Sequence, residues 1–412
     1  MKKDVTKLNI VWNTIGALAV SFTSLVYMLI LTHLYDLNKV GVFSFGFSFA
    51  CMMVTLASFG GRTYQVTDTN NKFDQITYIV TRYLTVIFSL LIVGIYLIVK
   101  DYNIEKTIMI VLLVLFKFCE EISDVYYGVL QRQEQLYKVG IFQTIKSVLN
   151  VIIFFVINYF VKNITVSVSA LLIINAIFAF IIERNSAKKI EKWKYKFEFD
   201  KIKSVLYNNF YICMFIFLSS YIISSPKYAI DSFLSEDIQA IFNILIMPAT
   251  FVYLVGSFIL NPFLVKVAKS FNQHKYQESK KQIKNIIMAL LAISVVIMLG
   301  AYILGIPVLN FVYGLNLSNY KMDFMIIMIG AIFYSISTVI STVLVAYRKI
   351  KIQSIIAIFL SVIAYILSRY LVNKYGLLGG IYEYTILMFI RFVVYSILIF
   401  SFFKNLTRKE SK

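Results

Sequence analysis

The chain has 412 residues, of which 59% are hydrophobic and 15% charged, and its mean hydropathy is +0.78. This composition excludes a soluble globular domain and is typical of a polytopic membrane protein. The formal net charge of +19 does not indicate nucleic-acid binding, because the basic residues are distributed over loops between apolar stretches.

The apolar stretches are long and unbroken, and they predict an all-α protein with about twelve transmembrane helices. A helix that crosses the hydrocarbon core needs about 20 apolar residues, whereas the strand of a spanning barrel shows alternation over about ten. We expect the helices at residues 8–34, 41–61, 78–99, 104–127, 139–161, 164–183, 205–225, 238–262, 284–305, 322–347, 350–372 and 377–403. The first stretch is too long for a secretory signal sequence and lacks a small-residue cleavage site, so we expect a permanent helix.

The longest polar segment divides these helices into two sets of six. We therefore expect an N-terminal six-helix lobe at 1–183, a basic cytoplasmic linker at 184–204, a C-terminal six-helix lobe at 205–403 and a cytoplasmic tail at 404–412. A faint internal similarity between residues 34–45 and 233–244 supports this division. Two equal halves around a central site are the usual layout of a transporter.

Lysine and arginine concentrate in the N-terminal segment, the tail and every second loop. Short loops rich in basic residues stay in the cytoplasm. This pattern predicts a multi-pass protein of the cytoplasmic membrane with both termini in the cytoplasm.

The cysteines and histidines do not indicate a disulfide, a metal site or a catalytic site. Cys51, Cys119 and Cys213 all fall inside predicted helices without paired spacing, which argues against disulfides and metal sites. His33 and His274 are the only histidines, and no P-loop motif is present. We therefore expect no metal, no cofactor and no enzymatic activity.

The fourth predicted span carries a stripe of charge. Lys117, Glu120, Glu121 and Asp124 stand at i, i+3, i+4 and i+7, so they share one helix face. A charge at bilayer depth costs roughly 2.5 to 3.5 kcal/mol on insertion scales and usually faces a wet cavity or a partner. The stripe therefore lines a cavity that binds cargo or couples ions, or else Lys117 pairs with Glu121 to stabilise helix contacts.

The fifth span repeats this spacing with Gln143, Lys146, Ser147 and Asn150. Lys146 lies close enough to the cytoplasmic end that its side chain could instead reach the headgroups. The side chain of Arg391 is less able to reach the headgroups, because Arg391 lies near the middle of the last span. We expect it to face a cavity.

Four further charges lie nearer the ends of predicted spans, and we expect most of them to be interfacial. They are Arg62, at the cytoplasmic end of the second span, Arg82 near the start of the third, and Arg369 and Glu383 near outer ends.

Several segments resemble those of a known transporter family. They are GVFSFGFSFA at 41–50, GGRTYQVTD at 60–68, SDVYYGVLQRQEQL at 123–136, PKYAIDSFLSEDIQAIFNI at 226–244, VLNFVYG at 308–314 and NKYGLLGGIYEY at 373–384. Over almost its whole length the chain resembles the polysaccharide-type flippases of the multidrug, oligosaccharidyl-lipid and polysaccharide (MOP) exporter superfamily, close to the Wzx-type transporters.

The resemblance implies two lobes around a central cavity that carry an undecaprenyl-pyrophosphate-linked oligosaccharide to the outer leaflet by alternating access, for O-antigen, capsule or exopolysaccharide. The family's PRY-like motif corresponds to Pro226, Lys227 and Tyr228, where lysine replaces arginine and offers phosphate only a point charge. The candidate substrate-binding residues are Lys117, Lys146, Arg391, Arg62 and Lys227, and the candidate ion-coupling residues are Glu120, Glu121 and Asp124.

Two alternatives remain open. A cation-coupled multidrug exporter of the same superfamily usually has an acid-lined cavity, and Lys117, Lys146 and Arg391 argue against it. A membrane enzyme of polysaccharide assembly usually carries catalytic acids on a large outer loop, and the predicted outer loops are short. The expected partners are the lipid-linked cargo, membrane lipids, and a polysaccharide polymerase and glycosyltransferases, with no nucleic acid.

Overall fold

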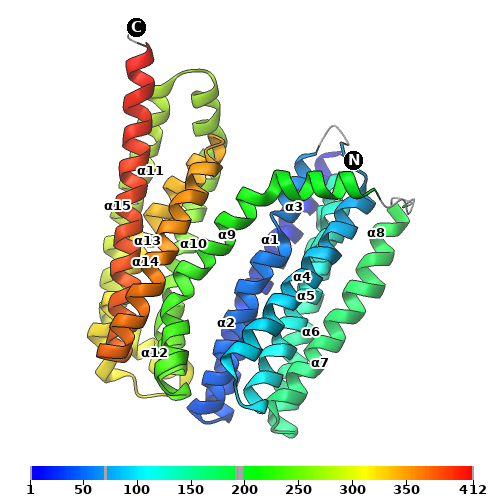
Figure 1. The fold of residues 1–412 in the computed structure, drawn as a ribbon, viewed down its shortest axis with the longest axis vertical. Helices are drawn as coiled ribbons and strands as arrows, with labels where there is room; N and C mark the ends of the chain where they lie inside the picture. Colours follow the sequence, from blue (N-terminus) through cyan, green and yellow to red (C-terminus); the bar gives the residue numbers. More distant parts are fainter. Residues whose placement is uncertain (1, 69–71, 191–192, 194–197, 411–412) are drawn as a thin grey trace. The chain divides into compact units, whose positions relative to one another are not determined.

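The computed structural model describes residues 2–68, 72–190, 193 and 198–410, and the regular elements within these ranges are all helices (Figure 1). The chain divides into two compact units, Met1–Ser220 and Tyr221–Lys412. Helix α9 (Phe199–Phe233) contributes to both units.

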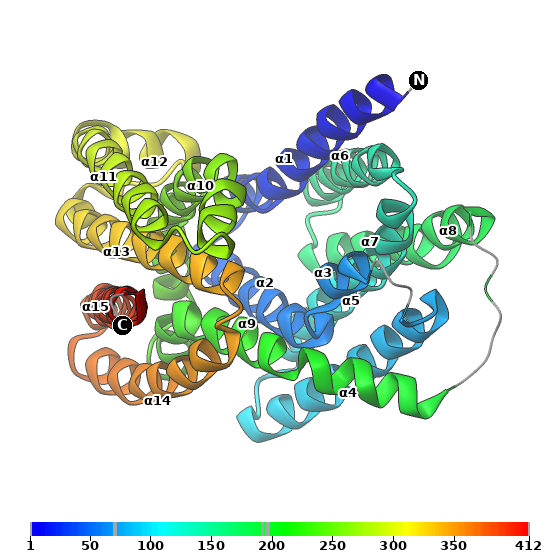
Figure 2. The ribbon, with the colours of Figure 1, turned by 90° about the horizontal axis from the view of Figure 1, so that it is seen from above.

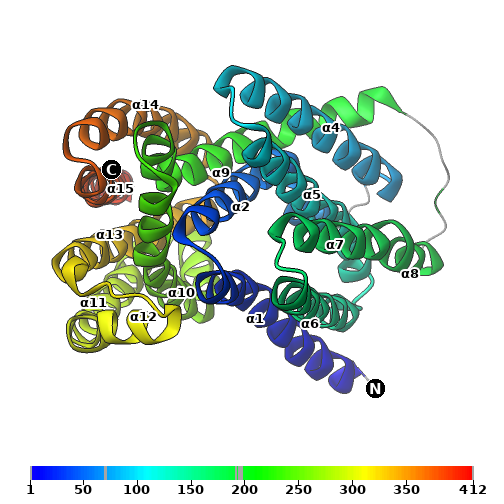
Figure 3. The same cartoon turned by 90° about the horizontal axis from the view of Figure 1, so that it is seen from below.

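The first unit is a bundle in which α5 is the central helix. It contains α1 (Lys2–Leu34), α2 (Leu37–Ser58), α3 (Gly61–Thr67), α4 (Gln75–Lys100), α5 (Ile104–Arg132), α6 (Leu136–Phe160), α7 (Ile164–Ile177), the π-helical turn η1 (Phe178–Glu183) and α8 (Arg184–Ile190). Helix α1 packs along α6, and α5 lies between α2 and α7 (Figures 2 and 3). Both sides of α5 are therefore covered by other helices, which positions its polar face inside the bundle.

The N-termini of three of these helices are capped by side chains. The oxygens of Asp36, Asn103 and Asn163 accept hydrogen bonds from backbone N–H groups three residues later, at 3.0, 2.8 and 3.2 Å. Each cap satisfies a backbone donor that has no partner within its helix. These caps fix where α2, α5 and α7 begin.

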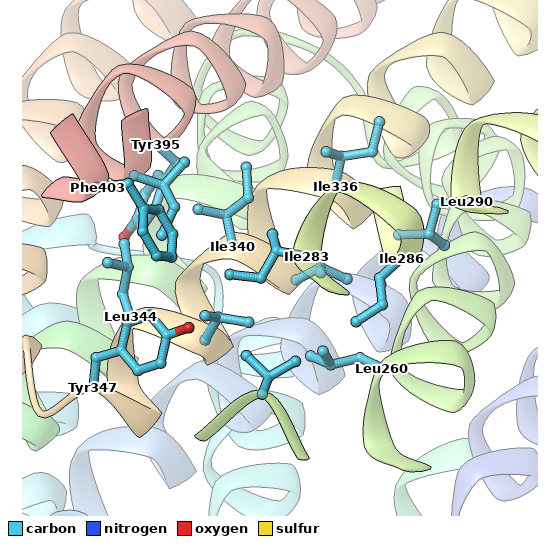
Figure 4. Close-up of a cluster of buried hydrophobic side chains, with 14 residues drawn as sticks. Leu260, Ile283, Ile286, Leu290, Ile336, Ile340, Leu344, Tyr347, Tyr395 and Phe403 are labelled. Atoms are coloured by element: carbon cyan, nitrogen blue, oxygen red, sulfur yellow. The ribbon is translucent and has the colours of Figure 1, made fainter. Parts of the chain in front are cut away.

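The second unit has an apolar interior. It contains α10 (Glu236–Asn272), α11 (Tyr276–Gly300), the π-helical turn η2 (Ala301–Gly305), α12 (Ile306–Tyr313), the short 3₁₀ turn η3 (Ser318–Tyr320), α13 (Lys321–Ala346), α14 (Ile350–Tyr375) and α15 (Leu377–Glu410). Helix α13 packs against both α10 and α15 (Figure 2). Buried Leu, Ile, Val, Tyr and Phe side chains from α10, α11, α13 and α15 fill the space between them (Figure 4).

The expectation of an all-helical chain with about twelve spanning helices is confirmed. Eleven helical segments in the described residues are long and apolar enough to cross a membrane. Helix α5 is a further helix of this length, and its charged residues keep it outside that group. Large apolar side chains such as Ile98, Phe160, Val296 and Phe359 remain exposed on the bundles, as hydrocarbon contact requires.

Several helices extend beyond the expected spans. Helix α9 begins at Phe199 rather than 205, and α10 ends at Asn272 rather than 262. Within the polar segment 184–204, α8 covers residues 184–190. Apolar length measures only the part of a helix inside hydrocarbon, whereas helical hydrogen bonding continues through polar residues at the surface.

Candidate functional site

A polar cavity of about 340 Å³ lies inside the first unit, between α1, α2, α5 and α6. Helix α1 contributes hydroxyl groups of Ser21, Thr23 and Ser24, and α2 contributes Phe47 and Cys51. The opposite walls come from α5 and α6. Charged and polar walls at this depth in a bundle of spanning helices suit water or a polar ligand rather than lipid.

The two stripes with i, i+3, i+4 and i+7 spacing meet in this cavity. Its walls include Lys117, Glu120, Glu121 and Asp124 from α5 and Gln143, Lys146, Ser147 and Asn150 from α6. Because residues with this spacing share one face of a helix, two facing helices bring both sets together. Five of the eight candidate site residues therefore line one space.

Lys117 forms an ion pair with Glu120. Its Nζ donates to Glu120 Oε2 at 2.8 Å and lies 4.8 Å from the ring centroid of Phe47. The alternative pairing with Glu121 does not form, because Glu121 faces another cation. The side chains of Lys117 and Glu120 are 14% and 30% exposed, so this pair borders the cavity space.

Lys146 points into the bundle rather than toward the headgroups, so the alternative of an outward-reaching lysine is wrong. Its Nζ lies 3.2 Å from Glu183 Oε1 and 3.2 Å from Ser123 Oγ. The Tyr127 hydroxyl donates to the same Glu183 oxygen at 2.5 Å. Glu183 ends the π-helical turn η1 and is fully buried, so Lys146 has a fixed counter-ion.

Arg82 is buried, although its position near the start of the third span indicated an interfacial residue. Its guanidinium pairs with Glu121, and Nη1 lies 3.8 Å from Asp124 Oδ2. Helix α4 begins at Gln75, so Arg82 lies about two turns inside it. From there the long side chain reaches across to α5, where carboxylates compensate its loss of hydration.

Arg62 completes the set of charges. Its Nη1 lies 3.3 Å from Asp124 Oδ1, and its Nε donates to Gln131 Oε1 at 2.8 Å. We define the charge cluster as four cations and four carboxylates, namely Lys117, Lys146, Arg62, Arg82, Glu120, Glu121, Asp124 and Glu183. With all its members ionised, the charge cluster has no net charge, and each carboxylate faces at least one cation.

A break in the second span makes room for Arg82. Phe59 and Gly60 adopt left-handed backbone conformations, with φ of 46° and 73°, between α2 and α3. A Cβ atom at Gly61 would overlap Arg82 Nη2. The Thr85 hydroxyl donates to the carbonyl of Ala57 at 2.6 Å, which compensates part of the interrupted helical hydrogen bonding.

The remaining candidate cations, Arg391 and Lys227, belong to the second unit and do not line this cavity. Arg391 on α15 is 3% exposed, and its guanidinium carbon lies 5.0 and 5.5 Å from the ring centroids of Tyr334 and Tyr395. Its Nη1 has no hydrogen-bond partner among the described residues. Lys227 is partly buried on α9.

Glu383 is a buried carboxyl group of the second unit, and not an interfacial residue as expected. It is fully buried, and its Oε1 lies 2.7 Å from Ser225 Oγ. Its Oε2 has no hydrogen-bond partner within the part of the chain that is described. Ser225 Oγ also lies 2.9 Å from the carbonyl oxygen of Ile222.

Sequence reasoning did not select Glu183 or Arg82. Each lies near the end of a predicted span, where a charge is ordinary, and each finds its partner on another helix. The sequence does indicate that such partners exist. The charged stripe of the fourth span carries three acids, Glu120, Glu121 and Asp124, but one mid-span cation, Lys117, so the acids require cations from other helices.

No protein-family model matches the chain. It is 26% identical over 334 residues to the capsular polysaccharide biosynthesis protein CapF of Staphylococcus aureus, a match that covers 79% of this chain and 83% of CapF. Its structure is similar to an inward-facing multidrug resistance MATE family transporter of the MOP superfamily, with a TM-score of 0.70, 11% identity and coverage of 97% and 99%. It also resembles a mutant of the Vibrio cholerae MATE transporter VcmN, with a TM-score of 0.62, 13% identity and coverage of 99% and 98%.

The chain has the MOP transporter fold. A MOP superfamily transporter from Pyrococcus furiosus, described as having a binding pocket of reverse polarity, matches with a TM-score of 0.59, 13% identity and coverage of 98% and 96%. Together with the similarity to CapF, these matches support the resemblance to polysaccharide-type MOP exporters. The MOP fold and the many apolar helices identify a multi-pass membrane protein.

We expect Gly61→Ala to destabilise the protein by about 3 kcal/mol, because the added methyl group displaces the Arg82 guanidinium and leaves a buried charge pair broken. Gly94→Ala, on α4 where a Cβ meets no atom within 4 Å, should be neutral or slightly stabilising. Thermal unfolding of both variants in detergent measures the difference. Equal melting temperatures would show that Arg82 does not depend on Gly61.

Glu183→Gln should destabilise the protein by about 3 kcal/mol, because it leaves Lys146 without its counter-ion. Glu383→Gln makes the same chemical change at another fully buried carboxyl group, but among the described residues no cation loses a partner. We therefore expect it to change the free energy of unfolding by less than about 1 kcal/mol. Denaturant unfolding of the two variants tests this, and equal losses would contradict the difference.

Proposed function

We propose that this protein exports an undecaprenyl-pyrophosphate-linked oligosaccharide, moving it from the cytoplasmic to the outer leaflet during the synthesis of a surface polysaccharide. The observation that carries the proposal is the position of two lysines, Lys117 and Lys146, on the wall of a cavity inside a membrane-spanning bundle. The MOP fold supports transport rather than catalysis. The similarity to a capsular polysaccharide biosynthesis protein supports the class of cargo.

The charge of this cargo favours outward movement. Each elementary charge that crosses 100 mV changes the free energy by about 2.3 kcal/mol. A pyrophosphate with about two negative charges therefore gains roughly 4 to 5 kcal/mol when it leaves an inside-negative cell. Cations at mid-depth lower the barrier by replacing part of the hydration of the pyrophosphate.

Each unit has its own proposed contacts. In the first unit, Lys117 and Lys146 contact the anionic linkage in the cavity, where Arg62 pairs with Asp124 of the cavity wall. In the second unit, Arg391 and Lys227 are the cations that contact the cargo. The protein resides in the cytoplasmic membrane with both termini in the cytoplasm, works by alternating access, and supplies cargo to a polysaccharide polymerase after glycosyltransferases have assembled it.

Export of a cationic drug is the second candidate function. The observation that favours it is the presence of Glu120, Glu121 and Asp124 on the same cavity wall. Several structures with this fold are multidrug transporters. The proposals differ in the charge of the cargo, so they predict opposite consequences of removing Lys117.

The test is the leaflet distribution of undecaprenyl-pyrophosphate-linked oligosaccharide in cells depleted of the protein. We expect the intermediate to accumulate in the cytoplasmic leaflet, and wild type to clear it. Lys117→Ala combined with Arg391→Ala should clear it at least about tenfold more slowly, since each variant removes a charge-assisted contact. Lys281→Ala removes an exposed lysine at the start of α11 and should behave as wild type.

Two results would contradict the proposal. If depletion causes no accumulation of the intermediate, the cargo is wrong and drug export becomes the leading function. If the double variant clears the intermediate as fast as Lys281→Ala does, the cationic residues are not the binding site.

A further inference from the structure

We propose that Lys117 and Glu120 form an exchangeable ion pair: an anionic group of the phosphoryl type binds the Lys117 ammonium in place of the Glu120 carboxylate. This inference rests on the proposed function and specifies how its cavity binds a negative charge.

The charge cluster has no net charge when all its members are ionised, so it does not by itself attract an anion. Lys117 and Lys146 line the cavity, yet both already face carboxylates at 2.8 and 3.2 Å. An anion that enters without further change meets those carboxylates as well as the lysines, and the repulsion offsets the attraction. Strong anion binding therefore requires that one carboxylate lose its charge or its place.

Glu120 is the carboxylate most easily displaced. Its side chain is 30% exposed, borders the cavity, and makes its one described hydrogen bond with Lys117. Glu183, in contrast, is fully buried and is held by both Lys146 and Tyr127.

The other two carboxylates are also held more firmly. Glu121 pairs with the buried Arg82, and Asp124 lies near two guanidinium groups, those of Arg62 and Arg82. Guanidinium groups are always charged and fit carboxylates in a fixed geometry, so these pairs do not exchange readily.

Lys117 can keep its position after Glu120 leaves. Its Nζ lies 4.8 Å from the ring centroid of Phe47 on α2 and 5.1 Å from that of Phe116 on its own helix. Both rings attract the ammonium group through their π electrons, and neither depends on the position of Glu120. The cation therefore remains at the cavity wall to bind an anion.

The other charged and titratable groups around this pair leave Glu120 as the competitor for Lys117. They are Tyr27 from α1, Cys51 from α2, Cys119, Glu121, Asp124 and Tyr127 from α5, and Lys146 from α6. The carboxylates among them are already paired with cations. Removing the negative charge of Glu120 by substitution therefore removes the competitor, so anion binding strengthens.

Sulfate binding to the purified full-length protein in lipid nanodiscs tests the exchange. Sulfate is a tetrahedral dianion and serves as the probe for a phosphoryl group. We expect wild type to bind sulfate weakly, because Glu120 competes for Lys117. Glu120→Gln should bind it about tenfold more tightly than wild type.

Two control variants accompany this measurement. Lys117→Ala should abolish binding. Asp237→Asn, which removes an exposed acid at the start of α10, should bind as wild type does and so excludes a general effect of net charge.

The exchange is overturned if Glu120→Gln binds sulfate no more tightly than wild type, or if Lys117→Ala still binds it. These outcomes are separate from those of the leaflet assay: the exchange can fail while the lipid intermediate still accumulates on depletion, and it can hold for a cargo of another kind.

Discussion

A charged side chain between membrane-spanning helices needs a counter-ion, because hydrocarbon cannot hydrate it. In the first unit this requirement connects α3, α4, α6 and η1 to the single helix α5. Arg62, Arg82 and Lys146 each come from a different helix, and each reaches a carboxylate on α5 or on η1. Truncating Arg82 or Glu183 leaves a buried partner, Glu121 or Lys146, without its described counter-ion, so the helices are held together by the same groups that give the cavity its polarity.

The second unit meets the same requirement differently. Its interior is filled by apolar side chains, and its buried Arg391 rests against the rings of Tyr334 and Tyr395. Its buried carboxyl, Glu383, has a serine hydroxyl as its neighbour. The interiors of the two units therefore differ. The first unit contains many charged side chains that pair with one another, and the second contains a few charged side chains among apolar and aromatic ones.

The periodicity of the sequence predicted the helices and the two polar stripes because both depend on residues close together in the chain. Lys117 and Glu120 are three positions apart, and helical geometry alone places them together. The partners of Glu121 and Lys146 could not be predicted in this way. Arg82 and Glu183 are 39 and 37 residues distant from them, and only the packing of α4 and η1 against α5 brings them within reach.

The break at Phe59 and Gly60 divides the second span into two pieces with separate tasks. Phe47 and Cys51 on α2 face the cavity, whereas Arg62 follows the break on α3 and holds Asp124. A continuous helix would carry these residues on one rigid rod, so that any tilt at the cavity would pull Arg62 from its carboxylate. Because the break interrupts the helical hydrogen bonding, the cavity wall on α2 and the Arg62–Asp124 contact on α3 belong to separate helices, and α3 is anchored to α5 independently of α2.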